Sequence, residues 1–368
     1  MRVYVVGGAL RDDLLGLKSV DRDYVVIGST PEEMIALKYV PVGKDFPVFL
    51  HPITKEEYAL ARTEKKSGQG YKGFTFYTSP DVTLEEDLIR RDFTMNAIAR
   101  EVNSNGEWIG ALIDPYEGQK DIQRKLIRHL SPAFSEDPLR ILRLARFATK
   151  LTDFEVADET YILAKKMVKE GELDHLVAER ISQEILRGLM GAKPSRMLDV
   201  FEKIDALKVI FPKDFLETEI LKITKSELDL AANANLELFS RCAILMNKVG
   251  NQVAENWFER LKISEELKAF SLLYKNWCVV SQTKDLRNAS LYLEFLNQAD
   301  AWRKPLRLNE IFSLAKFFHH DMTVWEKVFE VSRNVSAGEI AKNMTHAEGS
   351  AIGRAVKLAR LKAIEACL

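Results

Sequence analysis

Cysteine is scarce in this chain of 368 residues, and no apolar run approaches the length of a membrane span. Cys242, Cys278 and Cys367 are too far apart to form a metal-ligand spacing, and their odd number does not suggest a disulfide framework. The first apolar run, "VYVV" at 3–6, is too short for the core of a signal peptide. We therefore expect a cytoplasmic protein without membrane contact, in a reducing environment.

An excess of charge of either sign is also lacking. Lys and Arg number 53, Asp and Glu number 54, and the formal net charge is −1. A nucleic-acid-binding protein with this balance must gather its basic side chains on one face. The hydrophobic content of 46% and the length of the chain are sufficient for two or more globular domains.

The character of the sequence changes near residue 130. Before it, glycines and helical segments separate short β-rich runs, which predicts a small mixed α/β unit. These runs lie at 3–6, 23–27, 46–50 and 57–61. In "STPEEM", Thr30, Pro31 and Glu33 have the order of a capping box that begins a helix. Beyond residue 131 nearly every segment has helical periodicity, so we predict an α+β protein with an α/β head and an all-helical remainder.

Two carboxylates interrupt one of the β-rich runs. "VDRDYVV" places Asp21 and Asp23 two residues apart in a strand, so their side chains share one face and repel each other. Asp is depleted in strands, and a buried carboxylate needs a positive partner. Arg22 and other basic residues at a solvated strand end would supply that charge, and so would a metal ion.

A glycine pair precedes these carboxylates. "VVGGALRDDLLG" passes from a strand through Gly7 and Gly8 into an amphipathic helix that carries Arg11 on its first turn. Glycines at such a turn let a ligand approach the backbone, and a helix N-terminus attracts anions. The sequence matches neither GxGxxG nor GxxxxGK[ST]. A phosphate-binding turn beside two carboxylates is what metal-dependent phosphoryl transfer requires.

Two further segments are rich in arginine. "TLEEDLIRRDFTMNA" predicts a helix that is capped by Thr83 and ends near Arg90 and Arg91, whose charges would match the helix C-terminus. "EDPLRILRLARF" predicts a helix that begins after an Asp-Pro pair and carries arginines at steps of three. From these residues alone, a solvated basic helix face is the simplest interpretation.

Taken together, the motifs resemble those of the bacterial class II tRNA nucleotidyltransferases, the CCA-adding enzymes of the polymerase-β-like nucleotidyltransferase superfamily. "GGALRDDLLG", "DRD", "RRDFTMNA", "DPYEGQKDI" and "EDPLRILRLARF" occur in the family's order, within roughly the first 190 residues. The resemblance implies a seahorse-shaped fold with a nucleotidyltransferase head at 1–130 and a helical neck at 131–195. It further implies a tRNA-binding helical body and tail at 196–368. "FHHD" at 318–321 lacks the additional His and Asp of an HD phosphohydrolase site, so we expect no such domain.

The resemblance also implies an activity. Members of the family add C, C and A to the 3′ end of tRNA from CTP and ATP, without a nucleic-acid template, by Mg²⁺-dependent nucleotidyl transfer that releases pyrophosphate. Their partners are the 3′ end and acceptor arm of tRNA. By this resemblance Asp21 and Asp23 are the catalytic ligands of Mg²⁺, with Glu57 and Glu64 as candidates for a third carboxylate. The nucleotide-binding residues would be Gly8, Arg11, Arg91, Asp137, Arg140, Arg143 and Arg146. In the helical neck, Glu136, Asp137 and Arg140 fall on the family's nucleobase-reading motif.

Other functions remain open at this point. Poly(A) polymerases and enzymes that add only A or only CC share the head and neck motifs. Lys44-Asp45 stands where poly(A) polymerases usually have two basic residues, which favours CCA addition. A catalytically inert tRNA-binding protein would have no reason to keep the repulsion between Asp21 and Asp23.

Two segments outside these motifs lead to expectations about nucleotide addition and tRNA binding. "RTEKKSGQGYKGF" at 62–74 is charged, glycine-rich and without apolar period, so we expect it to be mobile without substrate. The alternative is that it is only a long hairpin loop. In the family, a flexible loop at this place helps the site change from C to A addition, so shortening 67–72 should selectively depress addition of the terminal A. The basic amphipathic segment 349–366 resembles the family's tail helices. Its residues Arg354, Lys357 and Lys362 would either contact tRNA phosphates or form plain solvated surface.

Overall fold

The computed structural model describes residues 1–18, 22–42, 48–66, 74–283, 287–344 and 349–368. Asp21, Lys44-Asp45 and the segment 67–72 therefore lie outside the described residues. The chain divides into two compact units, Met1–Pro212 and Lys213–Leu368, which are described separately. The predicted boundaries at 130 and 195 both fall within the first unit, and the division into head, neck and body stays a prediction.

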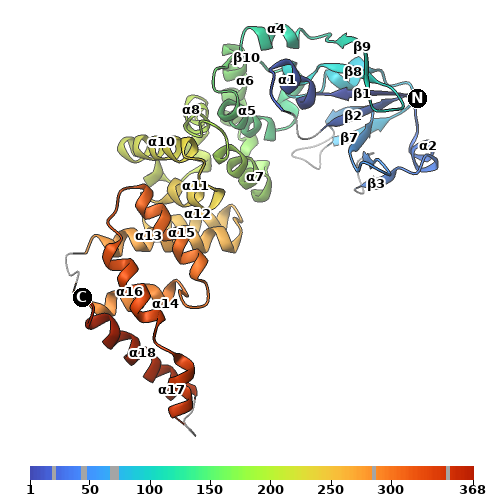
Figure 1. Cartoon of the computed structure of the whole chain (residues 1–368). Helices are drawn as coiled ribbons and strands as arrows, with labels where there is room; N and C mark the ends of the chain where they lie inside the picture. Colours follow the sequence, from blue (N-terminus) through green and yellow to red (C-terminus); the bar gives the residue numbers. More distant parts are fainter. Residues whose placement is uncertain (19–21, 43–47, 67–73, 284–286, 345–348) are drawn as a thin grey trace. The chain divides into compact units, whose positions relative to one another are not determined.

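A seven-stranded sheet forms the base of the first unit, in the order β3-β4-β5-β2-β1-β8-β9 (Figure 1). All neighbouring strands are antiparallel except β2 and β5, which run parallel. Strands β1, β2, β4 and β5 confirm the four β-rich runs of the sequence. The strand bounds are β1 Arg2–Val6, β2 Asp23–Ile27, β3 Val40–Val42, β4 Val48–Leu50, β5 Glu57–Leu60, β8 Ala99–Val102 and β9 Trp108–Ile113.

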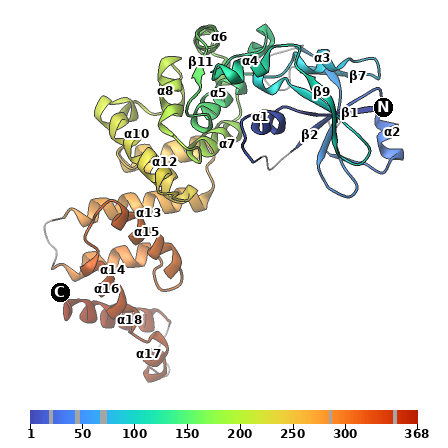
Figure 2. The same cartoon turned by 45° about the horizontal axis from the view of Figure 1, so that its top comes forward.

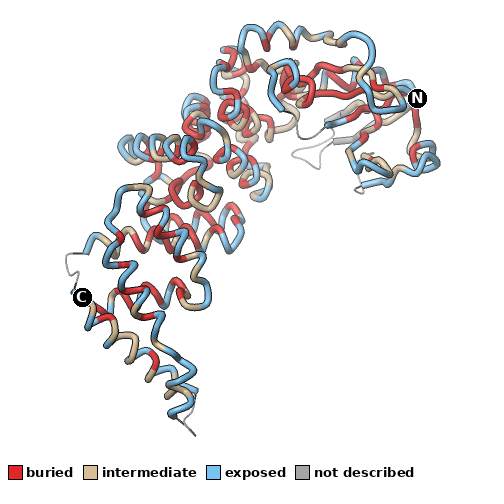
Figure 3. Tube along the Cα trace, viewed as in Figure 1, coloured by how far each residue is buried: buried red, intermediate tan, exposed pale blue. Residues whose placement is uncertain are grey.

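The two faces of this sheet are buried differently. Alternate residues of β1 and β2, such as Val6 and Val25, pack with Leu84 and Leu88 of α3 (Leu84–Leu88) into one hydrophobic core. Figure 3 shows the same strands as largely buried. On the opposite face, Tyr24 of β2 stacks on Tyr58 of β5, with ring centroids 4.4 Å apart. The period of two that predicted these strands thus gives each face its own set of apolar side chains.

Short helices surround the sheet, and longer ones follow it. Thr30 forms the predicted capping box at the start of α2, and Thr83, predicted as a cap, also forms a capping box at the start of α3. Helix α5 packs against both α7 and α8 (Figure 2). Residues 62–66, part of the segment expected to be mobile, form strand β6 and pair antiparallel with β7. The other strands and α-helices described in this unit are β6 Arg62–Lys66 with β7 Phe74–Thr78, β10 Leu126–Ile127 with β11 Glu155–Val156, α1 Gly8–Leu14, α2 Pro31–Ala36, α4 Gly118–Gln123, α5 Leu139–Lys150, α6 Asp158–Lys169, α7 Ala178–Leu189, α8 Ser195–Lys203 and α9 Leu207–Ile210.

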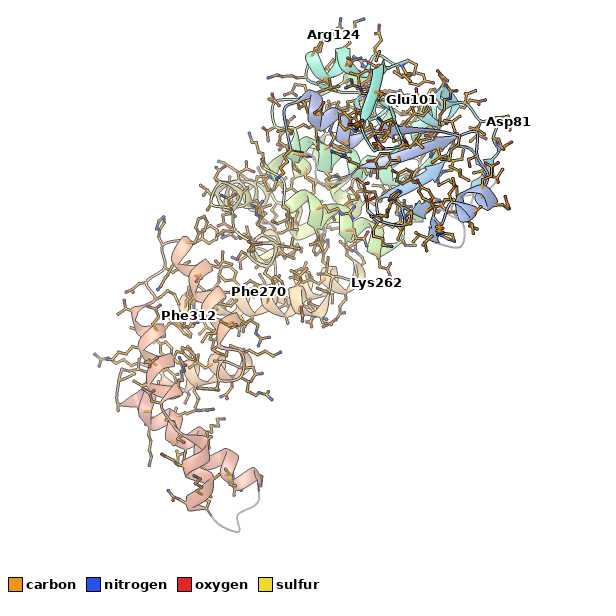
Figure 4. The ribbon with its side chains drawn as sticks, turned by 45° about the vertical axis from the view of Figure 1, so that its right-hand side comes forward. Asp81, Glu101, Arg124, Lys262, Phe270 and Phe312 are labelled. Carbon is orange, nitrogen blue, oxygen red and sulfur yellow. The ribbon has the colours of Figure 1, made fainter. Side chains whose placement is uncertain are left out.

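The described part of the second unit is helical, as the sequence predicts. Phe270 on α13 and Phe312 on α15, both labelled in Figure 4, are buried in its interior. His320 of "FHHD" packs edge-on against Trp277, and Asp321 accepts a hydrogen bond from the Thr323 amide at the start of α16. The helices are α10 Thr218–Asn233, α11 Leu238–Met246, α12 Asn251–Arg260, α13 Glu265–Ser281, α14 Ala289–Gln298, α15 Pro305–Phe317, α16 Thr323–Arg333, α17 Ala337–Asn343 and α18 Gly349–Glu365. Within the described ranges of the whole chain, no helix is both long and apolar enough to cross a membrane.

Candidate nucleotide-binding site

The glycine turn connects β1 to α1. Gly7 has a φ of +71°, a conformation that favours glycine, and its amide donates to the Ile98 carbonyl at 3.1 Å. A Cβ atom at Gly7 would lie 3.2 Å from Arg91 Nη1, and one at Gly8 would lie 3.6 Å from Arg11 Nη2. The fold therefore brings Arg91 to the turn that carries Gly8 and Arg11, although Arg91 is far from both in the sequence. Helix α1 has only seven residues, and these two guanidinium groups place positive charge beside its start.

Asp23 stands beside this turn, at the first residue of β2. Its neighbours in register are Val6 on antiparallel β1 and Glu57 on parallel β5. Residues in register point to the same face of a sheet, so the carboxylates of Asp23 and Glu57 share one face. Both residues are exposed, so the carboxylate of Asp23 is not buried in the strand. The burial of β2 begins only at Tyr24.

These carboxylates are chemically suited to a divalent cation. Exposed carboxylate oxygens are the ligands that Mg²⁺ prefers in proteins. Arg22, the alternative partner for the carboxylates, lies with its guanidinium carbon 5.5 Å from the centre of the Trp108 ring. In the portion of the chain that is described, which excludes Asp21, no three His, Cys, Asp or Glu side chains gather in a cluster that could hold a metal. The side chain of Glu64 is also outside the description, so Glu57 is the candidate third carboxylate that the structure places.

A buried carboxylate holds the arginine pair that follows α3. Asp87 has no exposed surface, and it accepts hydrogen bonds from Arg90 Nη2 at 2.9 Å and Arg91 Nη2 at 3.2 Å. Burial alone would raise the pKa of Asp87, but the charges of Arg90 and Arg91 outweigh it and keep that pKa below its ordinary value. The arginines thus pair with Asp87, where the sequence predicted a charge match to the helix terminus.

A second buried carboxylate, Asp92, connects the same segment to α5. Its Oδ2 accepts from Arg143 Nε at 2.7 Å and Nη2 at 2.6 Å, and its Oδ1 accepts from Asn96 Nδ2 at 2.9 Å. Burial opposes the ionised form, but the charge of Arg143 and these hydrogen bonds hold the pKa of Asp92 below its ordinary value. The same contact raises the pKa of Arg143. The pair is costly to break by removing Arg143, because Asp92 would then be a buried, uncompensated charge.

Acidification is expected to destabilise the first unit through these two carboxylates. Both have a lowered pKa in the folded chain, so their stabilisation is complete above the unfolded pKa of about 3.9 and is lost as the pH falls toward the folded values. We expect the melting temperature to fall steeply below about pH 4, and to fall less steeply with pH in the Asp92→Asn variant. The measurement is the melting temperature of both proteins from pH 7 to pH 3.

The control is Asp81→Asn, an exposed turn residue labelled in Figure 4. This variant should keep the slope of the wild-type protein. An Asp92→Asn variant with the same slope as wild type would contradict the electrostatic assignment.

The arginines of α5 do not form the solvated basic face that the residues alone suggested. Arg140 is buried, and Arg143 pairs with Asp92. Arg146 Nε donates to Glu184 of α7 at 2.6 Å. Burial lowers the pKa of Arg146, although Glu184 opposes that shift. The stripe is therefore buried or half-buried, and Arg143 and Arg146 pair with carboxylates supplied by other elements.

The residues that resemble a base-reading motif lie at the start of α5. Arg140 Nη1 donates to the Ala133 carbonyl at 2.6 Å, and its Nη2 donates to the Arg90 carbonyl. Asp137 Oδ1 accepts from the Leu139 amide at 3.0 Å, and its Oδ2 lies 3.5 Å from Arg180 Nη2 of α7. These contacts hold the carboxylate and the guanidinium plane in fixed orientations.

Several residues of this site were not identified from the sequence. In the sequence, "RRDFTMNA" fits Asn96 equally well to a site role and to an ordinary cap or turn. For Arg180 and Glu184 the sequence does offer a signal, because they stand four residues apart on α7 and so share one face. Those not identified are Asp12, Asp87, Asp92, Lys150, Arg180 and Glu184.

Comparison with known proteins agrees with this geometry. The family described as "Poly A polymerase head domain" matches residues 3–128, and "Probable RNA and SrmB- binding site of polymerase A" matches 153–213. The CCA-adding enzyme of Bordetella pertussis is 45% identical, over 99% of this chain and 96% of the relative. The multifunctional CCA protein of Methylobacillus flagellatus is 42% identical, over the whole of this chain and 97% of the relative.

Solved structures resemble the chain over nearly its whole length. "The structure of CCA-adding enzyme apo form II" has a TM-score of 0.69 at 24% identity, covering 99% of this chain and 88% of that one. "The complex structure of CCA-adding enzyme with CTP" has a TM-score of 0.64, also at 24% identity, over 99% of this chain and 87% of that one. At this identity the likeness shows the fold alone.

The glycine turn, the strand carboxylates and these matches define the class: the chain is a nucleotidyltransferase with a head of the poly(A) polymerase type. This superfamily is generally metal-dependent. The chain belongs to the family of CCA-adding enzymes.

Proposed function

We propose that this chain adds C, C and A to the 3′ end of tRNA, using CTP and ATP and releasing pyrophosphate. The observation that carries the proposal is the 45% identity to a CCA-adding enzyme over 99% of the chain, motifs included. Poly(A) polymerase is the second candidate, because the head-domain family that matches is described by that name. Lys44-Asp45, which bears on this choice, lies outside the described residues. The full-length relatives favour CCA addition.

The reaction joins a tRNA 3′ hydroxyl to a nucleotide. The hydroxyl oxygen forms a bond to the α-phosphorus, the bond from that phosphorus to the bridging oxygen of the β-phosphate breaks, and pyrophosphate leaves with the electron pair. The hydroxyl proton passes to solvent. In this proposal the turn at Gly8 and the guanidinium of Arg91 bind the triphosphate, and Arg11 of α1 adds its positive charge next to the turn. Their positions around one turn support the assignment.

The carboxylates are assigned to a divalent cation, which we propose to be Mg²⁺. Asp21, Asp23 and Glu57 would hold it, since Asp23 and Glu57 are exposed on one face beside the turn. When bound, Mg²⁺ neutralises the carboxylates and stabilises charge on the attacking and leaving oxygens. The contribution of the chain is to keep Asp23 and Glu57 together on one face, at the first residues of two paired strands.

The base is assigned to Asp137 and Arg140. A carboxylate and a guanidinium present acceptors and paired donors in fixed geometry, as the edge of a template base would. The backbone carbonyls of Ala133 and Arg90 orient the guanidinium of Arg140, and Arg180 faces Asp137. Arg143 and Arg146, in the same proposal, support these two residues from the following turns of α5.

The tRNA is assigned to the helical region, where the sequence predicted a basic row on the last helix. Arg354, Lys357 and Lys362 are exposed on α18, which supports contact with tRNA phosphates. We also infer a cytosolic location, because the three cysteines are free thiols and such thiols suit a reducing compartment.

The function is tested with the full-length protein and three tRNA transcripts, ending before, within and after the CC sequence. Each is offered one nucleoside triphosphate at a time, with Mg²⁺. We expect CTP to extend the first transcript by two residues and ATP alone to extend the transcript that ends in CC by one. Repeated addition of A to every transcript would instead establish a poly(A) polymerase, and extension by C without A would establish a partial enzyme.

Base selection should depend on Asp137. Replacing it by alanine is expected to lower the preference for CTP over UTP by about 5- to 150-fold, since one bidentate base contact is worth about 1–3 kcal/mol. The measurement is the ratio of kcat/KM for the two nucleotides on tRNA without CCA. The matched control is Asp158→Ala, an exposed residue at the start of α6, which should keep the ratio. Strict use of CTP by Asp137→Ala would remove this residue from base reading.

A further inference from the structure

A closed ring of side chains joins the phosphate-binding turn to helix α5. One half of it begins at Arg143, whose guanidinium donates to Asp92 Oδ2 at 2.7 Å. Asp92 Oδ1 accepts from Asn96 Nδ2 at 2.9 Å, and Asn96 Oδ1 accepts from Arg11 Nη1 at 2.6 Å. The amide of Asn96 therefore lies between a residue that contacts α5 and a residue of α1.

The other half returns to α5 by a different route. Arg11 Nε and Nη2 donate to Asp12 Oδ1 at 3.0 and 2.7 Å. Asp12 Oδ2 accepts from Lys150 Nζ at 2.8 Å, and Lys150 is the last residue of α5. The ring thus contacts α5 twice, at Arg143 and at Lys150, about two helical turns apart on one face.

An aromatic side chain lies between these two contacts. Phe147 is buried on the same face of α5, and its ring centre is 5.0 Å from the guanidinium carbon of Arg11 and 5.6 Å from that of Arg143. Such contacts are attractive and favour one orientation of each guanidinium. Phe147 therefore fixes the two arginines that the hydrogen bonds already connect.

The charges of the ring make it act as a unit. Arg11, Asp12, Asp92 and Asn96 are each less than 7% exposed. Removing one buried partner leaves a charged neighbour without compensation, so the contacts are expected to form and break together. Phosphate contacts carry no base identity by themselves. A ring that anchors them to α5, however, also fixes how far the base lies from Asp137 and Arg140.

We propose that Asn96 is a positioning residue and that Lys150 closes the ring, so that the preference for CTP depends on how the phosphate turn is anchored to α5. This inference rests on the proposed function. It assigns Asn96, Asp92, Asp12 and Lys150 no contact with the nucleotide. Their role is to hold the turn and the base-reading helix at one separation.

The experiment uses the full-length protein, tRNA without CCA, and CTP or UTP. The variants are Asn96→Ala, Lys150→Met and the double variant. Residues of one network couple, so we expect Asn96→Ala to lower the CTP-to-UTP ratio of kcat/KM by about tenfold and Lys150→Met by about threefold. The double variant should lose no more than Asn96→Ala alone, because the ring is already open. The side chain of Lys150 is 45% exposed, so its variant is expected to fold even if Asn96→Ala does not.

The matched control is Lys165→Met, a lysine of similar exposure that pairs with Asp205 outside the ring. It should keep the ratio of the wild-type protein. A second readout is inhibition by inorganic tripolyphosphate, which probes the phosphate site without a base.

Three results would overturn the inference. The first is an equal fall of kcat/KM for CTP and UTP in Lys150→Met. The second is a double variant whose loss is the product of the two single losses. The third is weaker inhibition by tripolyphosphate in Asn96→Ala with an unchanged nucleotide ratio. A wild-type protein that adds no C to any transcript would instead contradict the proposed function itself.

Discussion

Replacing Asp23 by asparagine is expected to lower the rate of C addition by about a thousandfold at saturating Mg²⁺. A metal bound by carboxylates stabilises transition-state charge by several kcal/mol, and most of this is lost when a ligand oxygen becomes an amide. The melting temperature should stay unchanged or rise slightly, because Asp23 and Glu57 are like charges directly opposite each other. Single-turnover addition to tRNA without CCA, together with thermal unfolding, measures both effects.

Asp13→Asn is the matched control, because Asp13 is an exposed carboxylate on the nearby helix α1. It should keep the rate of the wild-type protein. Substantial addition by Asp23→Asn at saturating Mg²⁺ would refute the assignment of this strand end as the catalytic centre.

The second large effect is expected at Gly118, the glycine of "DPYEGQKDI". A Cβ atom there would lie 2.2 Å from the Thr94 carbonyl oxygen, a distance that no packing tolerates. Gly118→Ala must therefore displace the turn at Thr94–Asn96, at a cost of about 3 kcal/mol. We expect the melting temperature of the first unit to fall by about 6–12 °C. Addition should fall as well, since the displaced turn carries Asn96.

Gly353→Ala provides the comparison. Gly353 lies within α18, and no atom would come within 4 Å of its added Cβ. Alanine should stabilise this helix by about 0.5–1 kcal/mol. If Gly118→Ala unfolded at the same temperature as the wild-type protein, the close approach of Thr94 would not constrain this position.

Local features of this fold could be predicted from the sequence because their causes are local. The strands at 3–6 and 23–27 follow from a period of two, and the starts of α2 and α3 follow from threonines placed three residues before a glutamate. The glycine turn is equally local, since Gly7 itself adopts the positive φ that the strand-to-helix turn requires.

The pairing of charges could not be predicted in the same way. Arg143 pairs with Asp92, 51 positions away in the chain, and Arg146 pairs with Glu184, 38 positions away. No period or spacing links such partners, so the arginines of α5 suggested a solvated face. The packing of α5 against α7 and against the segment after α3 decides instead which way they point. Asp87 differs, because its partners Arg90 and Arg91 follow at the local spacings i+3 and i+4. Nothing in "TLEEDLIRR", however, distinguishes a buried acid from an exposed one.

The aromatic side of the sheet has a consequence for the carboxylates on the other side. Tyr24 and Tyr58 stack with their rings 12° from parallel, and each stands one residue after an acid, Asp23 and Glu57. Sliding β5 by a single residue against β2 would turn Glu57 to the aromatic face and present Tyr58 to Asp23. The stacked tyrosines thus fix the register of β5 against β2. The alignment of the two acids at the surface is therefore determined by the aromatic rings on the opposite face of the sheet.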